Sequence, residues 1–220
     1  MLHILALALA AAPAVTAAEV GVTRAASVTE QDKPATFELA GFRLGMSEAE
    51  VEGVIKSRGL KVRRALRVIG FEDQVRGLIR ARNGRAPETG KSVLGEVEFD
   101  DLKGGSILLK LLAWPDAARI STITYLPPRG TDPQEWRRLL SQKYGPAADG
   151  GGSIDSDGLH ARWCGHASCS GAFAAFVLSA DVGQDGGSVQ LKQPDGTNSR
   201  RTKLIQADAG RRGPRSTPSF

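Results

Sequence analysis

The sequence predicts an α+β protein in which short helices pack on an antiparallel sheet. Stretches of alternating apolar and polar residues, typical of half-buried strands, are joined by connections that are too short for parallel βαβ units. Helix-capping residues stand ahead of apolar faces at two places. The body of the chain, residues 36–193, is long enough to bury a core, and 41% of all residues are hydrophobic.

Residues 1–18 have the pattern of a signal peptide. Their Ala-rich apolar run of about 10 residues has no Asp, Glu, Lys or Arg, and it is too short to span a membrane. Small residues follow, so we expect cleavage after Ala17 or Ala18. The alternative is a buried N-terminal helix, which Pro13 disfavours. We therefore expect an exported protein, periplasmic or secreted, with a flexible leader over residues 19–35.

The globular α+β domain is expected over residues 36–193, and it begins with a strand and a capped helix. Alternation over residues 37–42 predicts the strand. Ser47 and Glu50 have the spacing of a capping box, in which each side chain bonds the other residue's backbone N–H. Gly59 is suited to ending this helix because glycine adopts the left-handed conformation easily.

The following segment predicts a strand, a helix and a three-stranded meander. Lys61–Ile69 alternates and predicts the strand. From Phe71 onward apolar residues recur at i, i+4, i+7 and i+8, which predicts a helix ending near Asn83. Gly-Gly and Pro-Asp turn signals then separate three further strands. Those strands are expected over Leu94–Asp100, Ser106–Trp114 and Arg119–Tyr125.

The second half of the domain repeats the order of helix followed by strands. Asp132 and Glu135 have capping-box spacing around Pro133, and Gly145 ends the predicted helix. Strands are expected over Leu159–Cys164, Gly171–Ala180 and Ser188–Lys192. Because this order occurs twice, we hypothesise two similar helix-plus-sheet halves, residues 36–126 and 127–193.

Residues 194–220 are predicted to form a disordered basic tail. From Asp195 onward six Lys or Arg stand against two Asp, and Gly and Pro are frequent. A segment of this composition buries too little apolar surface to offset the entropy lost when it becomes ordered.

The stretch FELAGFRLGMSEAEVEGVIKSRG, together with the later KYGPA, resembles small exported proteobacterial proteins of the β-lactamase-inhibitor-protein and SmpA/OmlA-like type. About nine positions, covering a quarter of the chain, carry the resemblance: Gly45, Met46, Ser47, Val51 and Gly59, then Lys143, Tyr144, Gly145 and Pro146. The resemblance implies helices packed on an antiparallel sheet and a non-catalytic envelope protein that binds other proteins. No Cys stands at the expected cleavage point, so the lipid anchor of the lipoprotein members is not expected.

Cys164 and Cys169 are predicted to form a disulfide. Four residues between two predicted strands bring them within reach, and an exported chain matures in an oxidising compartment. One alternative is a metal site, because His160 and His166 interleave with the two Cys, although the spacing differs from that of usual zinc sites. Redox catalysis is a further alternative, but the sequence has no C-x-x-C motif. We expect the disulfide and no metal centre.

A basic segment over residues 56–85 holds ten Lys or Arg against two acidic residues. One interpretation is a solvated face whose charge is neutralised by carboxylates nearby in the sequence. The other is a surface for anionic partners, either an envelope protein or an anionic envelope surface. Nucleic acid is not expected, because no helix-turn-helix or aromatic-rich motif supports it. The candidate binding residues are Lys61, Arg63, Arg64 and Arg67.

The sequence thus predicts an exported, soluble, non-catalytic binding or envelope-associated protein of net charge +5 that needs no cofactor. It contains no G-x-S-x-G, H-E-x-x-H, P-loop or dinucleotide-binding motif, so no catalytic residue is assigned. No apolar stretch is long enough to span a membrane. The alternative is a secreted enzyme, a hydrolase or a metal-assisted one, that uses His160 or His166.

Overall fold

A computed structural model of the chain describes residues 36–86, 90–155, 158–166, 168–169 and 176–213. The expected signal peptide and leader lie outside the described residues, as does the start of the strand predicted over Gly171–Ala180. The described residues form helices packed on a large antiparallel sheet, which confirms the predicted α+β class.

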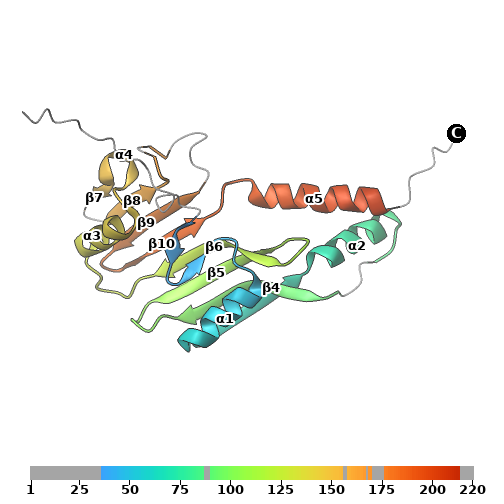
Figure 1. Ribbon diagram of the computed structural model, residues 1–220, viewed down its shortest axis with the longest axis horizontal. Coiled ribbons are helices and arrows are strands. Elements are labelled where there is room, and N and C mark those ends of the chain that lie inside the picture. The colour runs from blue at the N-terminus through green and yellow to red at the C-terminus, as the bar shows by residue number, and fades with distance from the viewer. Residues whose placement is uncertain (1–35, 87–89, 156–157, 167, 170–175, 214–220) are drawn as a thin grey trace, which may run out of the picture.

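The central sheet has eight strands in the order β3-β4-β5-β6-β10-β9-β8-β7, and all neighbouring pairs are antiparallel (Figure 1). From residue 61 onward, the ends of the predicted strands lie within two residues of the observed ends wherever the structure describes both. The exception is the C-terminal end of β9, which lies at Gly183 instead of Ala180. The strands are β3 (Val62–Ile69), β4 (Ser92–Asp100), β5 (Ser106–Ala113), β6 (Ala118–Leu126), β7 (Ser153–Ile154), β8 (Leu159–Trp163), β9 (Val177–Gly183) and β10 (Gly186–Lys192).

Two four-stranded meanders, β3–β6 and β7–β10, meet where β6 pairs with β10. Tyr125 of β6 lies opposite Val189 of β10 in this pairing. One core cluster crosses the junction and includes Phe99 of β4 and Trp163 of β8, both almost fully buried. Because they share this core, the two meanders form a single folded unit.

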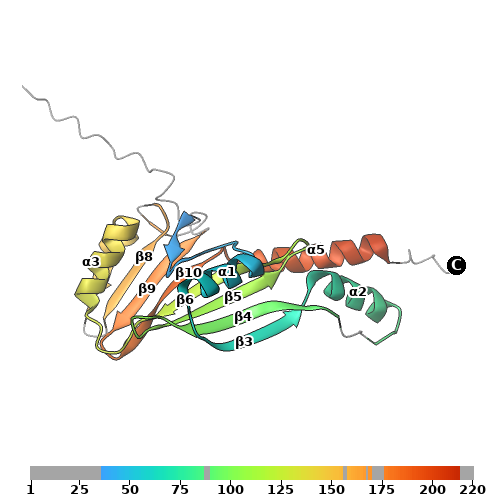
Figure 2. The same ribbon diagram turned by 60° about the horizontal axis from the view of Figure 1, so that its bottom comes forward.

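Two helices cover one face of the sheet (Figure 2). The helix α1 (Glu48–Arg58) contacts β6, and α3 (Pro133–Tyr144) contacts β8 and β9. Val51 of α1 and Leu140 of α3 join the alternating strand residues in the core. The core therefore lies between this face of the sheet and the two helices.

The capping box predicted for α1 is confirmed, whereas at α3 the Asp132 N-cap is confirmed but the box with Glu135 is not formed. The Ser47 N–H donates to Glu50 Oε2 at 2.7 Å, and the Glu50 N–H donates to Ser47 Oγ at 3.4 Å. Gly59 adopts the left-handed conformation at the end of α1, with φ of 62°. At α3, the Asp132 carboxylate accepts a hydrogen bond of 2.9 Å from the Gln134 N–H. These bonds satisfy backbone groups that a helix end leaves without intrahelical partners.

The expectation of one strand over residues 37–42 is wrong. The structure has a small hairpin there, formed by β1 (Glu38–Leu39) and β2 (Phe42–Arg43). Ala40 and Gly41 have φ of 53° and 87°, so the chain reverses between the two strands. Phe37, Leu39 and Phe42 nevertheless bury their side chains in the main core. The apolar alternation thus correctly indicated which side chains are buried, but it did not indicate the turn at Ala40 and Gly41.

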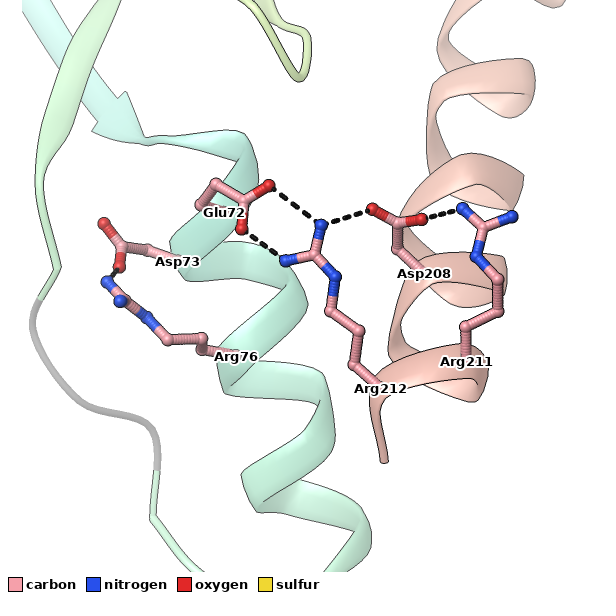
Figure 3. Close-up of polar contacts among 6 residues, drawn as sticks. All are labelled: Glu72, Asp73, Arg76, Asp208, Arg211 and Arg212. Carbon is pink, nitrogen blue, oxygen red and sulfur yellow. Dashed lines mark hydrogen bonds and ion pairs between the residues drawn. The ribbon is translucent and has the colours of Figure 1, made fainter. Parts of the chain in front are cut away.

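The prediction of a disordered tail over residues 194–220 is wrong for the part that the structure describes. Thr197–Arg212 forms the helix α5, which lies beside α2 (Phe71–Arg82) beyond one end of the sheet (Figure 1). Ile205 and Ala209, four residues apart, pack with Phe71 and Val75 in a second apolar cluster. Arg212 of α5 also pairs with Glu72 of α2 (Figure 3). A surface that exists only once α2 has folded therefore orders the helix, whereas residues 214–220 lie outside the described part.

Candidate functional site

The face of the sheet opposite α1 and α3 is polar, and we call it the open face. Gln190 Nε2 donates to Thr124 Oγ1 at 3.2 Å across β10 and β6. Lys110 and Asp181 are exposed here, while most of their polar neighbours are half-buried. One row of cross-strand neighbours on this face runs through Glu98, Leu108, Thr124, Gln190, Ser179 and Arg162.

The strand β3 forms one edge of the sheet, and all eight of its residues are exposed. Among the strands that the structure describes it pairs with β4 alone, so we call its outer side the β3 edge. Arginine and aliphatic side chains alternate irregularly along it. The exposed fractions of its larger aliphatic side chains are 43% for Val62, 41% for Leu66, 41% for Val68 and 51% for Ile69. Exposed aliphatic side chains on an unpaired edge are typical of an interaction surface.

The structure divides the candidate basic residues into two groups. Arg63 lies 3.4 Å from both Glu98 and Asp100, and Arg67 lies 3.0 Å from Glu48 of α1. These two arginines fit the interpretation in which nearby carboxylates neutralise the basic segment. Lys61 and Arg64 form no ion pair with any residue in the described ranges, and both are exposed. Among the four candidate residues, these two are the cations for which the described part of the chain provides no ion-pair partner.

A groove of about 450 Å³ lies between α2 and α5, beside the end of β3. We call it the α2–α5 groove. Its apolar lining comes from Ile69, Leu78, Ala81 and Ile205, and Gly77 leaves part of its wall without a side chain. A Cβ atom placed on Gly77 would meet no atom within 4 Å. Because Ile69 belongs to both surfaces, the groove continues the β3 edge.

Arg201 of α5 brings a positive charge to this groove. Its Nη1 donates to Gln74 Oε1 at 2.9 Å, and Gln74 Nε2 donates to the Ile69 carbonyl at 2.6 Å. Burial lowers the pKa of Arg201, and among the described residues no carboxylate forms an ion pair with it. Asp73, which also lines the groove, pairs with Arg76 (Figure 3).

His160 lies on the open face between two carboxylates. Its Nδ1 is 3.1 Å from Asp181 Oδ1, and its Nε2 is 3.5 Å from Asp155 Oδ1. The depression around it measures about 430 Å³, but the side chains of His160 and Asp181 are 41% and 74% exposed. Within the ranges that the structure describes, no three His, Cys, Asp or Glu residues are placed to hold a metal ion. The arrangement is therefore a solvent-exposed cluster of polar side chains.

Cys164 and Cys169 form the predicted disulfide, with their Cα atoms 5.7 Å apart. Both are buried with Ala148 of the short helix α4 (Ala148–Gly151) and with Val177 of β9. A hydrogen bond from Ser168, assisted by Arg162, holds the pKa of Asp149 below its usual range. The disulfide thus packs against α4 and β9, while His166, between the two cysteines in the sequence, is exposed.

Sequence reasoning missed the β3 edge and the α2–α5 groove. No local signal marked the edge, because the position of a strand within a sheet depends on which strands pair with it. In the described part of the chain, no helix is both long and apolar enough to cross a membrane. Comparison with protein-family models, curated proteins and solved structures finds no match for this chain.

Proposed function

We propose that this chain is an exported, non-catalytic protein that binds an acidic protein partner through the β3 edge. The observation that carries the proposal is an eight-residue edge strand that presents arginines and exposed aliphatic side chains together. Binding surfaces commonly combine apolar contact with arginine, because its guanidinium can pair with a carboxylate at two points.

The charge of the chain favours an acidic partner. The net charge is +5, and Lys61 and Arg64 have no carboxylate partner among the described residues. Opposite charge on a partner increases the rate of encounter and penalises wrong partners.

Two further features support export and binding rather than catalysis. The signal-peptide pattern of residues 1–18 and the Cys164–Cys169 disulfide both fit a periplasmic or secreted protein, since disulfides persist in oxidising compartments. The resemblance of residues 37–59 to proteins of the β-lactamase-inhibitor-protein and SmpA/OmlA-like type agrees with a role in binding proteins.

The proposal is tested by capture of partners from an envelope extract on the purified mature chain. The test variant, Lys61→Gln with Arg64→Gln, removes two positive charges from the β3 edge. The control, Arg129→Gln with Arg138→Gln, removes two exposed charges elsewhere. Deleting residues 195–220 would be a poor test, because it would remove α5 and its packing on α2.

We expect the mature chain and the control variant to retain an acidic protein that the test variant loses. High salt should release that protein, because salt screens exposed charges. Capture that is indifferent to both salt and the two substitutions would contradict the proposal. Binding to anionic lipid vesicles in place of any protein would assign the basic surface to the membrane surface instead.

A further inference from the structure

The unpaired edge of β3 leaves backbone groups available for pairing with another strand. β3 has eight residues, whereas β7 at the opposite edge of the sheet has two. An edge strand presents a row of N–H and C=O groups that an extended peptide can pair with. The length of β3 suits a peptide of similar length, and β7 is too short to serve in the same way.

The charges on β3 decide between possible occupants of its edge. A second copy of the chain would bring its own Lys61 and Arg64 to the β3 edge and so place the cations that have no ion-pair partner in the described residues against one another. Like charges on adjacent strands destabilise their pairing. A strand with Asp or Glu would instead pair with Arg64 and Lys61, for which the described residues provide no ion-pair partner. Charge complementarity therefore favours an acidic extended segment over self-association.

The α2–α5 groove adds an apolar anchor point at the end of this edge. Ile69 is the last residue of β3 and part of the groove wall, so a strand alongside β3 would reach the groove. Ile205 and Leu78 provide apolar contact, and Arg201 provides a guanidinium held by Gln74. Gly77 keeps the groove open, although glycine in a helix interior lowers helix stability relative to alanine.

We infer that the partner adds an extended acidic segment to the sheet along β3 and places an apolar side chain in the α2–α5 groove. This inference rests on the proposed function and supplies its mode of recognition. Main-chain pairing would provide affinity, while the arginines and the groove would select for alternating acidic and apolar residues.

The test uses a fluorescent peptide of alternating Glu and Val, eight residues long to match β3. Its affinity for the full mature chain is measured by fluorescence anisotropy. A peptide of alternating Lys and Val is the charge control. We expect the Glu peptide to bind with Kd below about 1 mM and the Lys peptide to bind at least tenfold more weakly.

Two variants separate the roles of the edge and the groove. Lys61→Gln with Arg64→Gln should weaken binding of the Glu peptide about tenfold, and Gly77→Leu should do so by filling the groove. Gly53→Leu in α1 is the matched control for Gly77→Leu, because a Cβ atom at either glycine meets nothing within 4 Å. Both leucine variants should stay folded, since leucine is a better helix former than glycine.

Hydrogen exchange reports the mode of binding directly. Backbone amides of Val62–Ile69 should exchange more slowly when the Glu peptide is bound, because strand addition gives outward-facing amides a partner. Failure of the Glu peptide to bind, or binding without slower exchange in β3, would overturn strand addition. If the β3 amides are protected from exchange without peptide, and this protection increases with protein concentration, the occupant of the edge is a second copy of the chain. That result would also overturn the inference.

These outcomes are distinct from failure of the proposed function. If the envelope extract still yields an acidic partner that depends on Lys61 and Arg64, the binding function stands even when the peptide shows no strand addition. If the extract yields no such partner and the peptide also fails, both the proposed function and its mode of recognition fall.

Discussion

Arg212 near the end of α5 lies against Glu72 in the first turn of α2, with its Nη1 2.6 Å from Glu72 Oε2 (Figure 3). The same guanidinium contacts Asp208 one turn earlier in α5, at 3.1 Å. A carboxylate at the N-terminal end of α2 thus meets a cation at the C-terminal end of α5, which suits the dipoles of both helices. The side chains of this pair are about half exposed.

Apolar burial should therefore stabilise α5 more than the ion pair does. Ile205→Ala removes a side chain that is 7% exposed, and we expect it to cost about 2 kcal/mol or more. Arg212→Gln should cost clearly less, because exposed ion pairs contribute little to stability. Urea unfolding of the two variants measures the difference, and hydrogen exchange in residues 197–212 shows whether α5 has detached. A larger loss for Arg212→Gln would contradict this order.

The disulfide should contribute a modest but measurable stability. Cys164 and Cys169 are five residues apart, and closing such a short loop removes little entropy from the unfolded chain. We expect the double variant Cys164→Ser and Cys169→Ser to lose roughly 2 kcal/mol in urea unfolding. Thiol counting on the native protein provides the control. Two titratable thiols in the protein purified from the envelope would contradict the disulfide itself.

The elements with local signals were predicted well from sequence. Ser47, Glu50 and Gly59 define the ends of α1 through contacts within a few residues, so their spacing alone revealed them. The longer strands of the two meanders were found because alternate residues face the core and short turns join them, whereas the two-residue strand β7 was missed.

The surfaces that carry the proposals depend on contacts that are distant in sequence. Nothing local shows that β3 lies at an edge, because that depends on which strands pair with it. α5 looked like a disordered tail because Ile205 and Ala209 gain a partner only when α2, more than 120 residues earlier, forms its face. The α2–α5 groove combines residues from both segments, so sequence reasoning could not find it.

Two helix glycines should be replaceable by alanine with a gain in stability. Gly53 of α1 and Gly77 of α2 occupy helix interiors, and a Cβ atom at either position meets nothing within 4 Å. We expect each glycine-to-alanine variant to gain about 1 kcal/mol in urea unfolding, and the double variant to gain the sum. A loss of stability for Gly77→Ala would show that the glycine is required for folding and not to keep the groove open.

The two tyrosines should make the fold sensitive to alkaline pH. Burial, with a hydrogen bond to Asp101, raises the pKa of Tyr125 from 10.0 to about 12. Burial, aided by the negative charge of Glu38, raises the pKa of Tyr144 still further, and its hydroxyl donates to the Glu38 carbonyl at 2.6 Å. In both cases the folded state holds the phenol proton more tightly than the unfolded state does.

Because both pKa values are raised in the folded state, the pH range over which stability is lost can be stated. Stability from the raised tyrosine pKa values is fully present below pH 10.0, the ordinary pKa, and falls as the pH rises toward 12 and beyond. Because the chain has only two tyrosines, tyrosinate absorbance reports these two alone. We expect little tyrosinate at pH 10.0 in the folded protein and half ionisation in urea. Tyr144→Phe should make the alkaline loss of stability shallower, whereas free ionisation of both phenols at pH 10.0 in the folded protein would contradict their burial.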